Sequence, residues 1–243
     1  MSDFLNTMLL KCENLVLGYG HERAVVSTPV NFELNAGDVV ALLGENGSGK
    51  STFLKTLCGL LPPVSGNVLL LGKSEWAARE RARFITLVRM SGVTCDRMTV
   101  REFVSLGRTP YAGIFDGRSK DDERIVDEAI ALLDLENFAS RWLTELSDGE
   151  RSRVYLAQAV AQQVKVLLLD EPNAFLDIPR SRKLFTLLQK LAKERGMGIL
   201  VSTHSVEYAE KYCGQIMVIA DKQVRVANAK NARAEGLLKW TED

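Results

Sequence analysis

The sequence contains no long hydrophobic run. Uninterrupted apolar stretches such as Val39–Leu43 and Ile216–Ala220 are five residues long, whereas a helix that spans a bilayer needs about 20 apolar residues. The N-terminus also lacks the basic and apolar regions of a signal peptide, and Asp3 stands where basic residues are expected. We therefore expect a chain that does not cross a bilayer and is not exported.

The sequence has no excess of charge of either sign, because 31 Lys and Arg balance 31 Asp and Glu. No overall field attracts nucleic acid or a membrane, so any such partner has to be recognised locally. Cysteines are few and scattered, since Cys12, Cys58, Cys95 and Cys213 form no C-x-x-C pair. This spacing favours reduced, mostly buried thiols of a cytosolic protein over disulfides or a metal site.

No linker, internal repeat or low-complexity tract divides the 243 residues. Apolar residues make up 46% of the chain and charged residues 26%, as in ordinary globular proteins. The chain is about one and a half times as long as a typical domain. We therefore expect one elaborated domain over residues 1–243.

Two β-rich runs near the N-terminus, residues 9–17 and 25–34, predict antiparallel strands. Further on, buried apolar runs of strand length alternate with helical patterns, which predicts a mostly parallel sheet covered on both faces, an α/β fold. A helical period over residues 99–145 predicts a helical insertion. The other expected strands are residues 39–43, 66–72, 84–88, 166–169 and 198–201, and the expected helices are 50–60, 75–83, 125–135, 150–163 and 182–195.

Residues 44–52 follow the pattern G-x-x-x-x-G-K-[ST] between a predicted strand and a predicted helix. The glycines let backbone N–H groups turn toward phosphate oxygens, and the next helix presents its positive end to the same anion. In this pattern Lys50 neutralises the β and γ phosphates, and Ser51 offers a hydroxyl to Mg²⁺. The alternative is a tight glycine-rich turn with a solvated lysine. The predicted nucleotide-binding residues here are Gly44, Asn46, Gly47, Ser48, Gly49, Lys50, Ser51 and Thr52.

The apolar run 166–169 ends in two carboxylates, Asp170 and Glu171. A buried strand delivers such side chains to the C-terminal edge of the sheet, where ligands of open α/β folds bind. We predict that Asp170 holds Mg²⁺, directly or through water, and that Glu171, which points the other way, acts as a base for water. Without the phosphate loop, the pair would be interpreted as a strand end that supplies acidic charge to a helix N-terminus.

The segment Leu146-Ser147-Asp148-Gly149-Glu150 begins a predicted helix, and Ser147 forms a capping box with Glu150. Here the chain resembles the ATP-binding cassette (ABC) ATPases over nearly its whole length, because this segment matches their LSGGQ signature except at Asp148 and Glu150. The resemblance implies a P-loop NTPase core with an N-terminal antiparallel β subdomain and an inserted helical subdomain. It also implies a homodimer in which Ser147, Asp148, Gly149 and Glu150 of one subunit cap the γ-phosphate bound by the other.

Other elements of the family match in order. Tyr19 lies where the family has an aromatic that stacks on adenine, Asp177 ends the segment that matches the D-loop, and His204 matches the switch histidine. The resemblance thus implies that Glu171, His204 and Lys50 are the catalytic residues. Outside this series, Tyr19 would be a packed turn tyrosine and His204 a structural residue at a strand end.

One departure concerns the Q-loop glutamine, which in the family binds Mg²⁺ and reports to the transmembrane partner. Arg89 and Met90 stand near its place, and no glutamine occurs between Thr52 and Gln158. A guanidinium has donors only and cannot ligate a metal. Either water completes the metal shell, or hydrolysis and coupling are altered.

Within the family, residues 99–111 look like the ATPases of ferric siderophore, haem and cobalamin importers, as do the runs LSDGER and LLLDEPNAFLD. This resemblance implies a subunit that uses ATP and Mg²⁺ at the cytoplasmic face of the inner membrane. Its implied partners are integral membrane permease subunits and, indirectly, a periplasmic substrate-binding protein, with no nucleic acid. The alternatives are an ABC ATPase without a permease, which works on nucleic acid or ribosomes, and a slow regulatory nucleotide-binding module.

Four aromatic and aliphatic residues in the insertion, Phe103, Tyr111, Ile114 and Phe115, lie near several arginines in the sequence. Such a group makes an amphipathic surface that suits a partner helix. It equally suits the packing of the insertion itself, and the sequence leaves both interpretations open.

Overall fold

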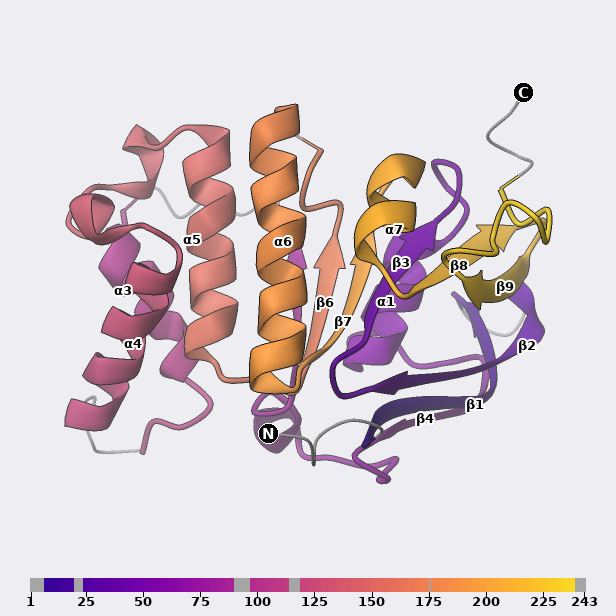
Figure 1. Ribbon diagram of the computed structural model, residues 1–243. Helices are drawn as coiled ribbons and strands as arrows, with labels where there is room; N and C mark the ends of the chain where they lie inside the picture. Colours follow the sequence, from indigo (N-terminus) through magenta and orange to yellow (C-terminus); the bar gives the residue numbers. More distant parts are fainter. Residues whose placement is uncertain (1–6, 20–23, 90–96, 114–118, 175, 239–243) are drawn as a thin grey trace.

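The computed structural model describes residues 7–19, 24–89, 97–113, 119–174 and 176–238 (Figure 1). Its strands form one sheet of three strands and one of six. The small sheet and the helical insertion lie at opposite sides of the molecule, with the larger sheet between them (Figure 1). The predicted α/β class is confirmed.

The small sheet is antiparallel and has the order β2-β1-β4, from β1 (Met8–Gly18), β2 (Ala24–Asn35) and β4 (Ser65–Leu70). The predicted N-terminal strand pair is therefore confirmed, and β4 joins it as a third strand. Gly66, with φ 80°, lies where the pairing of β1 with β4 shifts register, and a Cβ there would stand 2.2 Å from the carbonyl oxygen of Asn14. Only glycine fits so close an approach.

The central sheet has the order β5-β6-β7-β3-β8-β9 and is parallel except for β9. The mostly parallel sheet of the sequence analysis is confirmed. The β8–β9 hairpin turns at Asp221 and Lys222, both at positive φ, without the glycine that marks such turns in a sequence. The strands are β3 (Val39–Leu43), β5 (Ile85–Arg89), β6 (Val166–Asp170), β7 (Gly198–Ser202), β8 (Gln215–Ala220) and β9 (Gln223–Asn228).

Two hydrophobic cores cover the two faces of this sheet. Ala41 and Leu43 of β3 face the core shared with the longer helices, whereas Val40 and Leu42 face the core shared with α1 and the small sheet. Burial on both faces explains why β3 is apolar without alternation. The helices that pack on the sheet are α1 (Lys50–Cys58), α5 (Asp148–Ala161), α6 (Ile178–Arg195) and α7 (Val206–Tyr212).

The described residues of the predicted insertion, 99–145, are mostly helical, as predicted. Phe103 is 8% exposed and its ring centroid lies 5.3 Å from that of Tyr155, so it packs the insertion and does not face a partner. Tyr111 is half-buried, stacks beneath the Arg108 guanidinium and donates a hydrogen bond to the Gln162 carbonyl. Ile114 and Phe115 lie outside the described residues. The elements are α3 (Val100–Ser105), η1 (Leu106–Arg108), α4 (Lys120–Leu132), η2 (Glu136–Phe138) and η3 (Leu143–Glu145).

Helix boundaries differ from the predicted ones where a cap decides them. Ser119 caps α4, which therefore begins five residues before the predicted start. Asp177 caps α6, which begins four residues early. α1 ends at Cys58 because Gly59 takes the left-handed conformation. The predicted helix over 75–83 shortens to α2 (Ala78–Arg81).

Three of the four cysteines lie among the described residues, and all three are free thiols. Burial raises the pKa of Cys12 and of Cys213 to about 12, and that of Cys58 to about 11. Such thiols are unreactive, as the structural interpretation of the cysteines expects. Cys95 lies outside the described residues. No helix in the described ranges is long and apolar enough to cross a bilayer.

Candidate active site

The loop between β3 and α1 is shaped by glycines at positive φ. Gly44 and Gly49 have φ 151° and 111°. A Cβ on Gly44 would stand 2.6 Å from the Ile219 carbonyl oxygen, and one on Gly49 would stand 2.4 Å from Cγ1 of Val25. The N-terminus of α1 has no capping side chain and no acidic residue in its first turn. Its backbone N–H groups are therefore available to an anion.

Lys50 lies across the mouth of this loop and is only 5% exposed. Its Nζ donates to the carbonyl oxygens of Gly44 (2.8 Å) and Glu45 (3.0 Å) and lies 3.9 Å from Oε1 of Glu171. Burial lowers the pKa of Lys50, and the charges of Glu171 and Asp170 act in the opposite direction. The ammonium is thus held between the loop and the end of β6.

The remaining residues of the loop fit a phosphate ligand. Ser48 Oγ is buried and has no hydrogen-bond partner, and no other buried side-chain N or O atom of the described residues lacks one. Asn46 and Gly47 are exposed and line a cavity of about 320 Å³ together with Ser48. The buried ammonium and the free N–H groups donate hydrogen bonds, and the unpartnered Ser48 hydroxyl can donate one more, which suits the oxygens of a phosphate chain.

The first turn of α1 carries the other two predicted residues of the loop. Ser51 is exposed, whereas Thr52 is buried and its Oγ1 is 3.1 Å from the hydroxyl of Tyr19. Tyr19 therefore lies beside the phosphate loop, with 53% of its surface exposed. This placement leaves the ring available to a flat ligand.

The end of β6 brings the predicted carboxylates to the same place. Glu171 takes a left-handed conformation, φ 53°, and its Oε1 accepts a hydrogen bond of 2.8 Å from Nε2 of His204. The same Oε1 is the atom that faces Lys50. Lys50 at the start of α1, Glu171 after β6 and His204 after β7 are far apart in the chain, and the structure brings them together as the sequence analysis expects. These two contacts orient the Glu171 carboxylate toward the phosphate loop.

Ser202, the last residue of β7, links the two carboxylate positions. Its Oγ donates to Oδ1 of Asp170 and accepts from the backbone N–H of Glu171, each at 2.9 Å. Ser202 is fully buried. It thereby orients the Asp170 carboxylate and holds Glu171 in its strained backbone conformation.

We expect Ser202→Ala to lower the free energy of unfolding by about 1–3 kcal/mol, because it leaves a buried N–H and a carboxylate oxygen without their partner. Urea denaturation measures this change. Ser181→Ala is the matched control, since Ser181 is equally buried but makes one long hydrogen bond of 3.4 Å, and should cost less than about 1 kcal/mol. Equal losses for the two variants would contradict the bridging role of Ser202.

A second hydrogen bond joins the segments at the ends of β6 and β7, and the sequence analysis did not predict it. Thr203 Oγ1 donates to Oδ1 of Asn173 at 3.0 Å. With Ser202 and His204, three consecutive residues at the end of β7 thus hold the end of β6 and the segment that follows it. Alternating polarity could not reveal these pairs, because the partners are about thirty residues apart in the chain and meet only in the parallel sheet.

Arg89, at the end of β5, is the register partner of Asp170 in the neighbouring strand. Residues paired in register project to the same face of a sheet. Arg89 is exposed. The structure therefore places this arginine next to the predicted metal carboxylate, and Met90 lies outside the described residues.

The start of α5 lies apart from the phosphate loop (Figure 1), because α5 and α1 pack in the cores on opposite faces of the central sheet. The predicted capping box is confirmed: Ser147 Oγ donates to Oε2 of Glu150 at 2.7 Å, and this contact lowers the pKa of Glu150. Asp148 is exposed and pairs with Arg151, while Gly149 is buried against Arg180. One chain thus does not bring its signature segment to its own phosphate loop.

Asp177, predicted in the D-loop, caps α6 by accepting from the backbone N–H of Arg180 at 2.8 Å. Its carboxylate is exposed, as is that of Asp148 at the start of the neighbouring helix. The N-termini of α5 and α6 therefore present exposed polar groups along the same side of the molecule (Figure 1).

The chain matches one family model and is similar in sequence to known ATP-binding proteins. A family model described as ABC transporter matches residues 27–174. The petrobactin import ATP-binding protein of Bacillus anthracis is 36% identical over 204 residues, which cover 83% of this chain and 75% of that protein. The ferric enterobactin transport ATP-binding protein of Escherichia coli is 34% identical over 217 residues, which cover 88% of this chain and 79% of that protein.

Solved structures have the same fold. An ABC transporter assigned to the metal-chelate type, in an inward-facing conformation, matches with a TM-score of 0.85 and 27% identity over 97% of this chain and 90% of that chain. A dimeric ATP-binding cassette bound to ADP and phosphate matches with a TM-score of 0.78 and 27% identity over 91% of this chain and 99% of that chain.

Proposed function

The chain belongs to the ABC transporter family as an ATP-binding subunit with ATPase activity, and on this basis we propose that it drives an importer of iron chelates. The observation that carries the catalytic part is the position of Glu171, between His204 and Lys50 at the mouth of the phosphate loop. No other described carboxylate is held by both a histidine and the P-loop lysine.

The residues around the loop take separate roles in this proposal. Gly44, Asn46, Gly47, Ser48 and Gly49 shape the loop and bind phosphate oxygens, mostly through backbone N–H groups. Lys50 exchanges a loop carbonyl for the phosphate chain, and Thr52 holds Tyr19 beside the adenine position. Glu171 accepts a proton from the attacking water, while His204 keeps the carboxylate in place.

Oxygen atoms of two other side chains at the site fit Mg²⁺, which prefers hard oxygen ligands. Ser51 and Asp170 are the residues that would hold it, with Ser202 fixing the orientation of the Asp170 carboxylate. When bound, the ion supplies charge that neutralises the phosphate oxygens.

We further propose that the working unit is a homodimer. In one chain the start of α5 lies away from the phosphate loop. It carries the signature residues Ser147, Asp148, Gly149 and Glu150, and a second copy in antiparallel arrangement supplies them to the loop. The N–H groups at the start of α5 that the capping box does not use then act on the γ-phosphate. Asp177, at the start of the neighbouring helix, lies at the same boundary. A dimeric cassette among the structural relatives supports this arrangement.

The substrate assignment rests on the relatives. Two of them are named for petrobactin import and for ferric enterobactin transport, and a structural relative is of the metal-chelate type. We propose that permease subunits in the membrane carry the chelate, that a periplasmic binding protein delivers it, and that this chain binds peripherally at the cytoplasmic face. Of the predicted partner-facing surface, Tyr111, which stacks on Arg108, is the described residue that is left to contact a permease.

Deletion of the gene tests this proposal in the organism that encodes it. We expect the deletion strain to lose uptake of radiolabelled iron supplied as a chelate, and plasmid-borne wild-type chain to restore it. A Glu171→Gln chain should not restore it. Uptake that is unchanged by the deletion would reject the substrate, while purified chain that hydrolyses no ATP would reject the catalytic part.

Arg89 gives a prediction of its own. A fixed cation beside Asp170 repels a divalent ion and attracts the γ-phosphate, and at about 4 Å and an effective dielectric near 20 each unit-charge interaction is worth about 4 kcal/mol before solvent screening. We expect Arg89→Gln to raise ATP turnover or to lower the Mg²⁺ concentration for half-maximal activity. Lys165→Gln, which removes a cation at the opposite end of β6, is the control. Slower turnover in Arg89→Gln would mean that Arg89 is a functional contact.

A further inference from the structure

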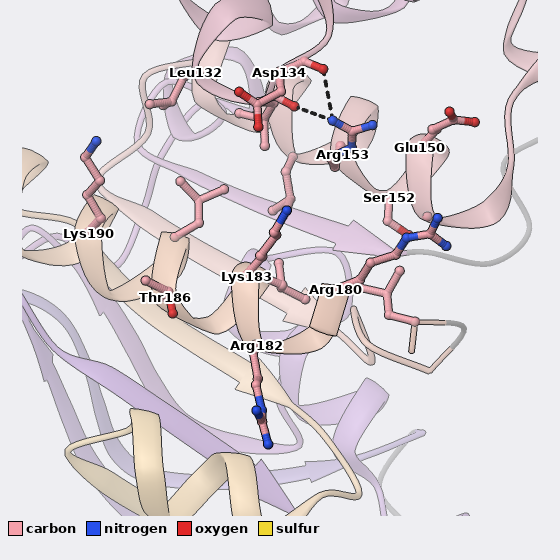
Figure 2. A pocket seen from close by; sticks show the side chains of 16 residues that line it. Leu132, Asp134, Glu150, Ser152, Arg153, Arg180, Arg182, Lys183, Thr186 and Lys190 are labelled. Carbon is pink, nitrogen blue, oxygen red and sulfur yellow. Dashed lines mark hydrogen bonds between the residues drawn. The ribbon is translucent and has the colours of Figure 1, made fainter. Parts of the chain in front are cut away.

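A groove of about 620 Å³ lies where the end of α4 meets α5 and α6. Figure 2 shows its lining, with Lys183, Lys190 and Arg180 on α6 and Arg153 on α5. We call it the α5–α6 groove. It contains none of the residues of the phosphate loop or of the strand ends, and its size is that of a ligand or peptide site.

The floor of the α5–α6 groove is apolar. Leu156 and Leu184 are buried beneath it, and Leu132, Leu176 and Leu187 lie half-buried along it. A half-buried leucine row between two helices leaves apolar surface that a ligand can cover. A simple anion gains nothing from such a floor.

The rim is strongly basic, although the whole chain has no net charge. Helix α6 carries six basic residues and one acidic residue, a net charge of +5. Within the described part of the chain, neither Lys183 nor Lys190 has an ion-pair partner, and Arg180 reaches Asp177 only at 3.8 Å. The basic charge on this rim is therefore largely uncompensated.

The two acidic groups at the groove do not offset this charge. Glu150 is committed to the capping box with Ser147. Asp134 presents its backbone oxygen to Arg153, at 2.9 Å, and its carboxylate is exposed at one end. The groove thus favours an acidic ligand.

The spacing of the cations excludes a compact anion. Arg180, Lys183, Leu187 and Lys190 are spaced i, i+3, i+7 and i+10, so they share one face of α6. This face is about 15 Å long, at 1.5 Å per residue. One phosphate or carboxylate cannot reach both Arg180 and Lys190, whereas acidic side chains spaced along a helix can.

We propose that the α5–α6 groove binds an acidic amphipathic helix of a partner protein, about three turns long. Its apolar residues, at i, i+3 or i+4, and i+7, cover the leucine floor, and its flanking Asp and Glu residues meet Lys183, Lys190 and Arg180. A second copy of this chain does not supply such a helix from its described residues. Its acidic helix α4 already buries Ile125, Val126 and Ile130 in its own core.

Binding there would also bridge two functional helices. Glu150 and Arg153 of α5 and Arg180 of α6 all line the groove, and α5 and α6 begin at Ser147 and Asp177. A helix seated between them would hold the two N-termini at a fixed separation. The binding itself needs no nucleotide, so its test is independent of the ATPase assignment.

The probe is a fluorescein-labelled synthetic helix of about 14 residues (about 21 Å) with Leu at the positions of one face and Glu beside them. A matched peptide carries Lys in place of Glu. We expect anisotropy titration of the nucleotide-free chain to give micromolar affinity for the acidic peptide, and affinity at least about tenfold weaker for the basic one. The acidic peptide should slow amide hydrogen exchange in residues 149–156 and 180–190.

The test variant is Lys183→Glu/Lys190→Glu, which should weaken binding of the acidic peptide at least about tenfold. Lys193→Glu/Arg195→Glu changes the charge of the same helix equally but lies outside the groove, and should alter the affinity less than about twofold. Equal losses in the two variants, or no binding by wild type, would overturn the proposal. So would equal competition by a DNA oligonucleotide, or self-association of wild type that is lost in the test variant.

Discussion

Glu171→Gln is expected to lower ATP turnover by about 10² to 10⁴ while leaving ATP affinity within about twofold. The amide has the shape of the carboxylate and can keep the contact with His204, but it cannot accept a proton from water. Steady-state hydrolysis and equilibrium titration with ATP measure the two quantities separately. The variant should also accumulate an ATP-bound dimer, visible by size-exclusion chromatography.

Several contacts fix the position of Glu171. Glu171 is held by its backbone N–H to Ser202 and by its side chain to His204, and it faces Lys50 at 3.9 Å. Its left-handed backbone is retained by glutamine, so the substitution changes proton transfer and little else. A substitution that kept the negative charge but lost these contacts would not separate the loss of proton transfer from a change in the position of the side chain.

Glu45→Gln is the matched control, because Glu45 is an exposed carboxylate of the phosphate loop and receives the same isosteric change. We expect its turnover to stay within about twofold of wild type. Turnover of Glu171→Gln as high as that of the control would show that another group, or water alone, takes the proton.

Local sequence patterns predict much of this site. Residues 44–52 are contiguous, and the glycines, Lys50 and the helix start follow from their order alone. Asp170 and Glu171 are likewise marked by the apolar strand that they end. In such segments the chemistry depends on residues next to one another in the chain, so a single sequence suffices.

Other contacts depend on which strands become neighbours. Ser202 meets Asp170, and Arg89 pairs in register with the same residue, only because β7 and β5 flank β6 in the sheet. The polarity of a single strand does not reveal its neighbours, since β6 and β7 are both buried on both faces. The sequence therefore predicts His204 through family resemblance but offers no signal for the role of Ser202.

The α5–α6 groove, on the surface of the molecule, could not be predicted from local sequence patterns either. Lys183 and Lys190 are ordinary exposed positions of an amphipathic helix, and nothing near them in sequence is unusual. Their significance comes from the leucines of α4 and α5 that lie opposite. The net charge of the whole chain hides this cluster, because acidic residues elsewhere, including those of α4, offset the basic charge of α6.

Lys50→Ala is expected to weaken ATP binding at least about tenfold, because each charge-assisted contact of the ammonium with phosphate is worth about 1.5–3 kcal/mol. In the structure the ammonium is already desolvated and held by two loop carbonyls, so it reaches phosphate without a large loss of hydration. Isothermal titration calorimetry with ATP measures the affinity. The stabilisation of the chain by saturating ATP in thermal unfolding should fall by about 1.4 kcal/mol for each tenfold loss.

Removal of Lys50 also leaves the carbonyl oxygens of Gly44 and Glu45 without their donor, which could loosen the loop by itself. Lys50→Met separates the two effects, since it retains the apolar stem and the packing but not the charge. Lys55→Ala, on the same helix but in its last turn, is the control for charge alone and should bind ATP as wild type does. If Lys50→Met binds ATP as tightly as Lys55→Ala, the ammonium contributes no phosphate contact, and the loop backbone alone accounts for the affinity.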